Sequence, residues 1–178
     1  EAGAVHAWDF DTGRGPEFKK PVPLPLGVPD LPLPVWVRQE GLAGTGALRF
    51  GSRGGSLLLP VGIRSGTLPI RLTFEVKVLS ETSCQLGTSA VAMDGEVHKL
   101  VSPTPGPLFV GQWHTDRWVH WERRFSLRED GNIEITQTYG EQPVGMVGVA
   151  QPDWHMTPGH ESYLEIHGVD ALIDNVRL

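Results

Sequence analysis

The sequence predicts an all-β fold made of two antiparallel sheets. Three observations support it: apolar residues recur at every second position, glycine and proline are abundant, and no long segment has helical periodicity. Of the 178 residues, 22 are glycine and 15 are proline, which favours short strands joined by turns. A chain of this length is about one domain, so we expect a single β-sandwich over residues 1–178.

The strongest strand patterns form a predicted hairpin in the second half of the chain and one strand before it. In residues 70–78 apolar and polar side chains alternate without exception, as in a sheet with one buried and one wet face. Residues 118–127 repeat the pattern, with Arg123 as the one exception on the apolar side. Residues 129–132 are Glu-Asp-Gly-Asn, which suit the positive φ of a tight turn, and residues 133–139 return as the partner strand.

Weaker strand patterns fill much of the remaining chain. We expect strands at residues 47–50, 56–59, 84–93, 97–101 and 144–149. The opening residues 8–10 and the closing residues 171–178 are predicted to lie close together and complete one sheet. The closing strand is expected to bury Leu172, Val176 and Leu178.

Residues 15–34 are rich in proline and hold seven of the fifteen prolines. Because proline has no backbone N–H, this stretch cannot be an interior strand. We expect residues 15–35 to wrap the sandwich as an extended loop that buries its interleaved leucines. The alternative is a ligand segment for an aromatic groove on another protein.

Three motifs in order suggest a family. They are Trp8-Asp9-Phe10-Asp11 near the start, Gly46-Ala47-Leu48-Arg49-Phe50, and the closing Ile173-Asp174-Asn175-Val176-Arg177-Leu178. In this order, with the predicted hairpin between them, they resemble the laminin G-like, concanavalin A-like lectin and glucanase superfamily. The resemblance implies a two-sheet jelly roll and an extracytoplasmic setting, whether secreted, periplasmic or at the cell surface. Members of the superfamily bind sugars, hydrolyse glycosides or mediate protein contacts.

The charge pattern argues against two classes of partner. The chain has 15 basic and 21 acidic residues, a formal charge of −6, and no cluster of Lys or Arg larger than a pair. A nucleic-acid partner is therefore not expected, and neither is an anionic membrane surface. No apolar run reaches the ~18–20 residues of a membrane span, so membrane insertion is not expected either.

Tryptophan and histidine neighbour each other late in the chain, and they are the candidate ligand-binding residues. Aromatic faces stack on the C–H surfaces of sugars, while polar neighbours orient hydroxyl groups. The candidates are Trp113, His114, Trp118, Trp154 and His155. The alternative is that these tryptophans pack in the core or at its rim, since a sandwich needs large side chains between its sheets.

A calcium site is the cofactor that the resemblance implies. Related sandwiches bind calcium through carboxylates and backbone carbonyls, and Asp9, Asp11 and Asp174 are the candidate ligands. The alternative is that Asp9 and Asp174 cap strands or pair with arginine.

The carboxylate pattern argues against hydrolysis. Glucanases of this superfamily place acid and nucleophile on one strand face as Glu-x-Asp-x-Glu, and no such triplet occurs here. We therefore predict a non-catalytic recognition module whose partner is a glycan. The alternatives are a structural or protein-interaction domain without a sugar ligand and, third, a glycoside hydrolase with two carboxylates from distant strands.

Overall fold

The computed structural model describes residues 7–10, 34–59, 68–80, 82, 85–94, 97–102, 115, 117–143, 148–150 and 161–178. In these residues the strands form two antiparallel sheets, and the only helical element is one 3-10 turn, Leu42–Gly44. The all-β prediction is therefore confirmed.

Nine strands of the described chain form the larger sheet, sheet A. Its main path is β10 (Gln142–Pro143), β9 (Ile133–Tyr139), β8 (Val119–Leu127), β5 (Ile70–Val78), β13 (Ala171–Arg177), β3 (Ala47–Phe50) and β2 (Val35–Val37). In addition, β1 (Ala7–Trp8) pairs with β13, and β11 (Gly148–Ala150) pairs with β9. The smaller sheet B follows the order β4 (Gly55–Leu59), β12 (Glu161–Val169), β6 (Gln85–Asp94) and β7 (Val97–Ser102).

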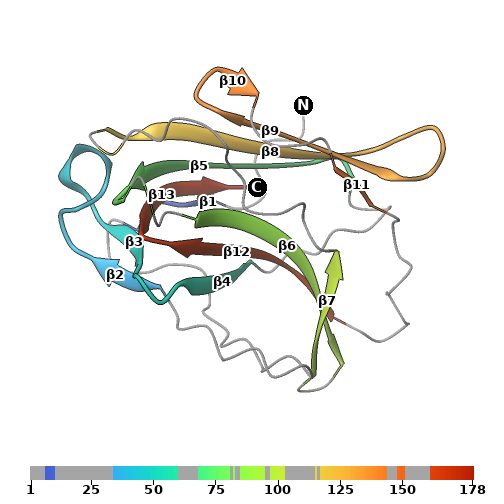
Figure 1. Cartoon of the computed structure of the whole chain (residues 1–178), viewed down its shortest axis with the longest axis horizontal. Helices are drawn as coiled ribbons and strands as arrows, with labels where there is room; N and C mark the ends of the chain where they lie inside the picture. The colour runs from blue at the N-terminus through green and yellow to red at the C-terminus, as the bar shows by residue number, and fades with distance from the viewer. Residues whose placement is uncertain are drawn as a thin grey trace.

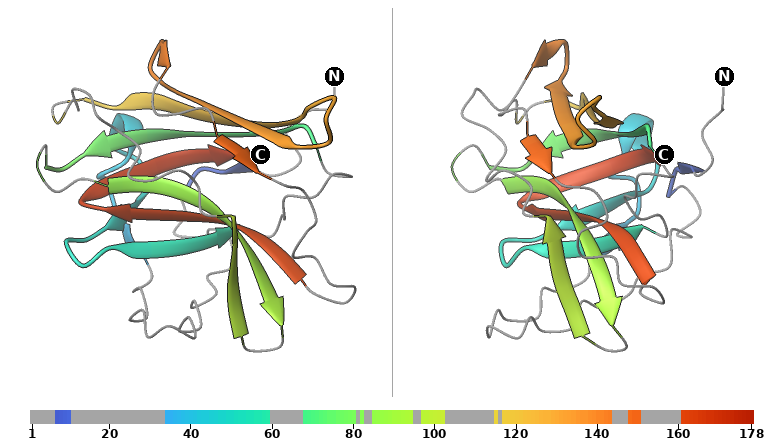
Figure 2. Two further views of the ribbon diagram at one scale, coloured as in Figure 1. Left: turned by 45° about the vertical axis from the view of Figure 1, so that its right-hand side comes forward. Right: turned by 90° about the vertical axis from the view of Figure 1, so that its right-hand side faces the viewer.

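The two sheets lie one above the other and share a hydrophobic core (Figure 1). Sheet A contributes Phe74 and Trp121, whose rings stack with centroids 4.5 Å apart, and sheet B contributes Leu57, Leu164 and Ile166, all fully buried. The core exists because alternate residues of each strand point to the same side. Beyond this core the β6–β7 hairpin reaches away from sheet A, as both views of Figure 2 show.

Three of the places where the chain crosses between the sheets meet at Asp170. The crossings follow β3, β5 and β12. The backbone N–H of Asp170 donates to the carbonyl of Gly51 at 3.2 Å, and its carbonyl accepts the N–H of Leu79 at 2.8 Å. One residue in the left-handed region, with φ of 48°, thereby satisfies backbone groups in all three crossings.

The closing strand β13 changes partner halfway along one edge, at Asp174 and Asn175. Ala171–Ile173 pair with β3, whereas Val176 and Arg177 pair with β1 on the same edge, because β5 occupies the other edge. The register with β5 shifts between Asp174 and Arg177, and Asn175 has φ of 51°. This bulge lets one strand hold both the start of the chain and β3.

The carboxylate of Asp174 fills the gap at this change of partner. It is 1% exposed; Oδ2 accepts the N–H of Leu42 at 2.9 Å, and Oδ1 accepts the N–H of Asn175 at 2.7 Å. The hydroxyl of Thr45 donates to the carbonyl of Leu42 at 2.6 Å and lies 3.3 Å from Asp174 Oδ2. The turn that leads into β3 is therefore tied to the last strand.

Two glycines allow this close approach. A Cβ on Gly41 would overlap the carbonyl oxygen of Gly46 and lie 2.8 Å from Asp174 Oδ2. A Cβ on Gly46 would overlap the carbonyl oxygen of Phe10, which accepts the indole N–H of Trp36 at 2.7 Å. Phe10 is fully buried with φ of 57°, so the segment after β1 turns inward against β2 and β3.

The expected closure of the sandwich is confirmed. Ala7 pairs with Arg177 and Trp8 with Val176. Leu172 and Val176 are buried, and Leu178 packs partly buried against the core.

Most predicted strands are present with small changes at their ends. Those at 47–50, 70–78 and 133–139 are found as predicted. The strands at 56–59 and 97–101 are one residue longer, that at 84–93 is displaced by one residue, and that at 118–127 is one residue shorter. The hairpin turn at 129–132 is confirmed: Gly131 has φ of 83°, and the N–H of Asn132 donates to Asp130 Oδ1 at 3.0 Å. Of the predicted strand 144–149 only the end is described, as β11, and β2 and β10 were not predicted.

Arg123, the exception on the apolar side of its strand, does point into the core. Its side chain donates to Gln137 Oε1 on β9, from Nε at 3.1 Å, and lies 5.3 Å from the centre of the Trp121 ring. Burial lowers the pKa of Arg123 to about 10, so the guanidinium stays charged at neutral pH. The proline-rich residues 15–33 lie outside the described part of the chain; Pro34 is buried, and Val35 begins β2.

We expect Asp174→Ala to lower the free energy of unfolding by about 2–4 kcal/mol, because it leaves buried N–H groups without their acceptor and creates a small cavity. Urea denaturation measures the change. Glu129→Ala, at an exposed turn position, is the control and should change stability by no more than about 0.5 kcal/mol. Equal stability of the two variants would contradict this role for Asp174.

Candidate functional site

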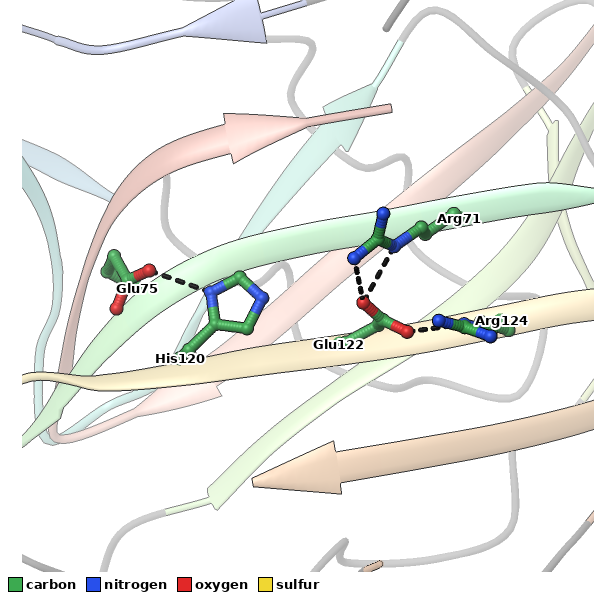
Figure 3. Close-up of polar contacts among 5 residues, drawn as sticks. All are labelled: Arg71, Glu75, His120, Glu122 and Arg124. Atoms are coloured by element: carbon green, nitrogen blue, oxygen red, sulfur yellow. Dashed lines mark hydrogen bonds and ion pairs between the residues drawn. The ribbon is translucent and has the colours of Figure 1, made fainter. Parts of the chain in front are cut away.

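The outer face of β5 and β8, on the side of sheet A away from the core, gathers paired charged side chains. Antiparallel pairing places Glu75 opposite His120, Thr73 opposite Glu122, and Arg71 opposite Arg124. Figure 3 shows Glu75 directed toward His120, and Arg71 and Arg124 directed toward Glu122. We call this surface the β5–β8 face.

Glu122 bridges two arginines at the centre of the β5–β8 face. Its Oε2 lies 2.7 Å from Nε and 2.6 Å from Nη2 of Arg71, and its Oε1 accepts a hydrogen bond from Nε of Arg124. The side chain of Glu122 is only 11% exposed, whereas those of Arg71 and Arg124 are 62% and 61% exposed. The carboxylate is thus covered by the two guanidinium groups that it binds.

The arginines keep Glu122 ionised. Burial by itself raises the pKa of this carboxyl, but the hydrogen bonds and positive charges of Arg71 and Arg124 outweigh it. The net effect holds the pKa of Glu122 below its ordinary value of 4.5. Glu122 is consequently a poor proton donor at neutral pH.

A second polar pair and an aromatic residue lie toward the start of β8. Nδ1 of His120 is 2.7 Å from Glu75 Oε1, and both side chains remain partly accessible. Trp118 comes directly before β8 and is half-buried. Trp118 therefore precedes His120 by two residues at the end of the chain segment that enters the β5–β8 face.

The arrangement presents oriented polar groups on a solvent-facing surface. Glu75 and Glu122 lie on neighbouring strands of the β5–β8 face at diagonal positions, and each carboxylate binds a different basic partner. A carboxyl that protonates a leaving group needs a raised pKa, whereas the pKa of Glu122 is lowered. The two carboxylates instead orient His120, Arg71 and Arg124.

Of the five predicted ligand-binding residues, only Trp118 lies in the described part of the chain, directly before β8 and half-buried. The others, Trp113, His114, Trp154 and His155, lie outside the described residues. The grouping of Glu75, His120, Arg71 and Arg124 on one face was not predicted. Their polar alternation was visible in the sequence, but the register that brings them together depends on strand pairing.

The described residues do not fit the implied calcium site. Asp9 is exposed, Asp11 lies outside the described part, and both oxygens of Asp174 face N–H donors, which oppose a cation. No group of three His, Cys, Asp or Glu able to hold a metal ion occurs within the described ranges. Because Asp174 accepts backbone N–H groups, it resembles the strand cap that was the alternative to a calcium ligand.

Comparison with known proteins adds no relative: the sequence matches no protein-family model, and no curated protein matches it. In the part of the chain that the structure describes, no helix has the length and apolar character needed to span a membrane.

We expect Glu122→Gln to destabilise the protein by about 1 kcal/mol near neutral pH, and less at low pH. A carboxyl whose folded pKa is depressed contributes stability above its unfolded pKa and loses it as the pH falls through the folded value. Urea titrations at several pH values should therefore show that the free energies of unfolding of the wild type and the variant become equal below about pH 4. Glu129→Gln is the control, because Glu129 is exposed and has no ion pair among the described residues. A difference in the free energy of unfolding between the wild type and Glu122→Gln that did not change with pH would contradict the prediction.

Proposed function

We propose that this chain is a non-catalytic recognition module that binds carbohydrate on the β5–β8 face of a concanavalin A-like jelly roll. The observation that carries the proposal is the Glu75–His120 pair on a solvent-facing sheet, with the half-buried Trp118 two residues before His120 in the chain. Sugar sites generally combine an aromatic platform with a few polar groups that are held in place.

The polar groups of this face are oriented before any ligand arrives. Glu75 positions the ring of His120, and Glu122 positions Arg71 and Arg124. Side chains that are already held lose less entropy on binding hydroxyl groups. A solvent-facing sheet surface gains little beyond the cost of association, so we expect micromolar to millimolar affinity, about 4–8 kcal/mol.

A protein-interaction domain is the second candidate, and one observation favours it. Val35 on the end strand β2 is 61% exposed, and nearby Trp36 and Leu42 are 38% and 37% exposed. Exposed apolar residues grouped at a sheet margin are typical of protein contact sites. With either partner, the resemblance to lectin-like sandwiches favours a secreted, periplasmic or cell-surface parent protein.

The test of the carbohydrate function is a glycan array followed by calorimetric titration of any sugar that binds. We expect Trp118→Ala to weaken binding about tenfold or more, because it removes the stacking surface. Trp113→Ala and Trp154→Ala test the two other predicted aromatic residues. Leu127→Ala is the matched control, an exposed apolar residue at the far end of the same strand.

Circular dichroism should first establish that each variant is folded. If no glycan binds, or if Trp118→Ala binds as the wild type does, the β5–β8 face is not the sugar site. Release of reducing ends from any bound polysaccharide would contradict the non-catalytic part of the proposal.

A further inference from the structure

We propose, on the basis of the carbohydrate-binding function above, that the β5–β8 face selects acidic oligosaccharides. In this proposal Arg124 binds the carboxylate of a uronic acid unit, and the sugar chain runs along β8 toward Trp118. The proposal depends on the carbohydrate function and adds the ligand class and its direction on the sheet.

Arg124 keeps its outer edge available. Its Nε donates to Glu122, whereas Nη1 and Nη2 have no partner among the described residues, and its side chain is 61% exposed. A guanidinium group presents its donors in a planar fork that matches a carboxylate with two parallel hydrogen bonds. The Nη1–Nη2 edge of Arg124 is such a fork, already held in orientation at Nε.

Arg71 supports the same selectivity from the neighbouring strand. Both its Nε and Nη2 lie against Glu122 Oε2, and its side chain is 62% exposed. The bridge of two guanidinium groups and one carboxylate carries a net positive charge. Because Glu122 anchors both arginines, an anionic ligand meets donors that need little further ordering.

The spacing along β8 requires an oligosaccharide. Trp118 and Arg124 are six residues apart, which corresponds to about 20 Å of extended strand. A single sugar ring cannot contact both residues. The Glu75–His120 pair lies between them and can exchange hydrogen bonds with the hydroxyls of the intervening units.

Neighbouring acidic groups limit how much negative charge the face accepts. Glu75 lies on the same face. Glu134 on the neighbouring strand β9 is diagonal to Arg124, because Arg124 pairs with Thr136 and Glu134 is two residues before Thr136. These carboxylates repel a densely charged polyanion. The face therefore favours sugars with spaced carboxylates over a heavily sulfated chain or an acidic peptide.

The test uses galacturonate oligomers and their methyl esters, which differ only in charge. Calorimetric titration of the whole chain should show the acid form binding about tenfold more tightly than the ester, and the monomer binding much more weakly than the oligomer. Arg124→Gln should remove the preference for the acid form. Arg124→Lys should restore only part of it, because lysine keeps the charge without the fork.

Arg128→Gln is the matched control, since Arg128 is a partly exposed arginine paired with Asp130 at the hairpin turn. Equal binding of acid and ester, or an unchanged preference in Arg124→Gln, overturns the proposal while carbohydrate binding by Trp118 stands. Polyglutamate or heparin binding as tightly as the oligomer also overturns it. Failure to bind any sugar, neutral or acidic, overturns this proposal together with the carbohydrate function.

Discussion

The carboxylate of Asp174 ties the turn before β3 to the closing strand β13. It lies where one edge of β13 passes from β3 to β1, and its oxygens accept N–H groups from the 41–46 turn and from Asn175. A charged group with 1% exposure is stable only when its lone pairs are filled by donors. The start of the chain, the entry to β3 and the closing strand therefore have to be arranged together.

This constraint extends to the surface that we propose as functional. The strand β13 pairs with β5, and β5 pairs with β8. A shift of β5 by one residue would turn its polar side chains into the core and its apolar ones outward. The register that places Glu75 opposite His120 is thus part of the same pairing scheme that Asp174 closes.

Stability and recognition come from opposite sides of sheet A. The inner side packs Phe74, Trp121 and Phe125 against sheet B, and burial of these large apolar groups supplies most of the favourable energy. The outer side carries ion pairs with exposed arginines, which contribute little to folding. The value of those ion pairs is that they hold guanidinium and imidazole groups in defined positions, as a binding surface requires.

The sequence by itself determined the strands and the side to which most residues point. Alternation over residues 70–78 and 133–139 is a local consequence of extended backbone, so it was predictable, as were the turn at 129–132 and the pairing of the two ends. Only the tertiary structure decided which side chains meet. Arg71 reaches Glu122 across 51 positions and Leu42 reaches Asp174 across 132, because strand register and the bulge in β13 bring them together. Local patterns contain neither of these, so the role of Asp174 and the charged bridge on the β5–β8 face followed from the fold.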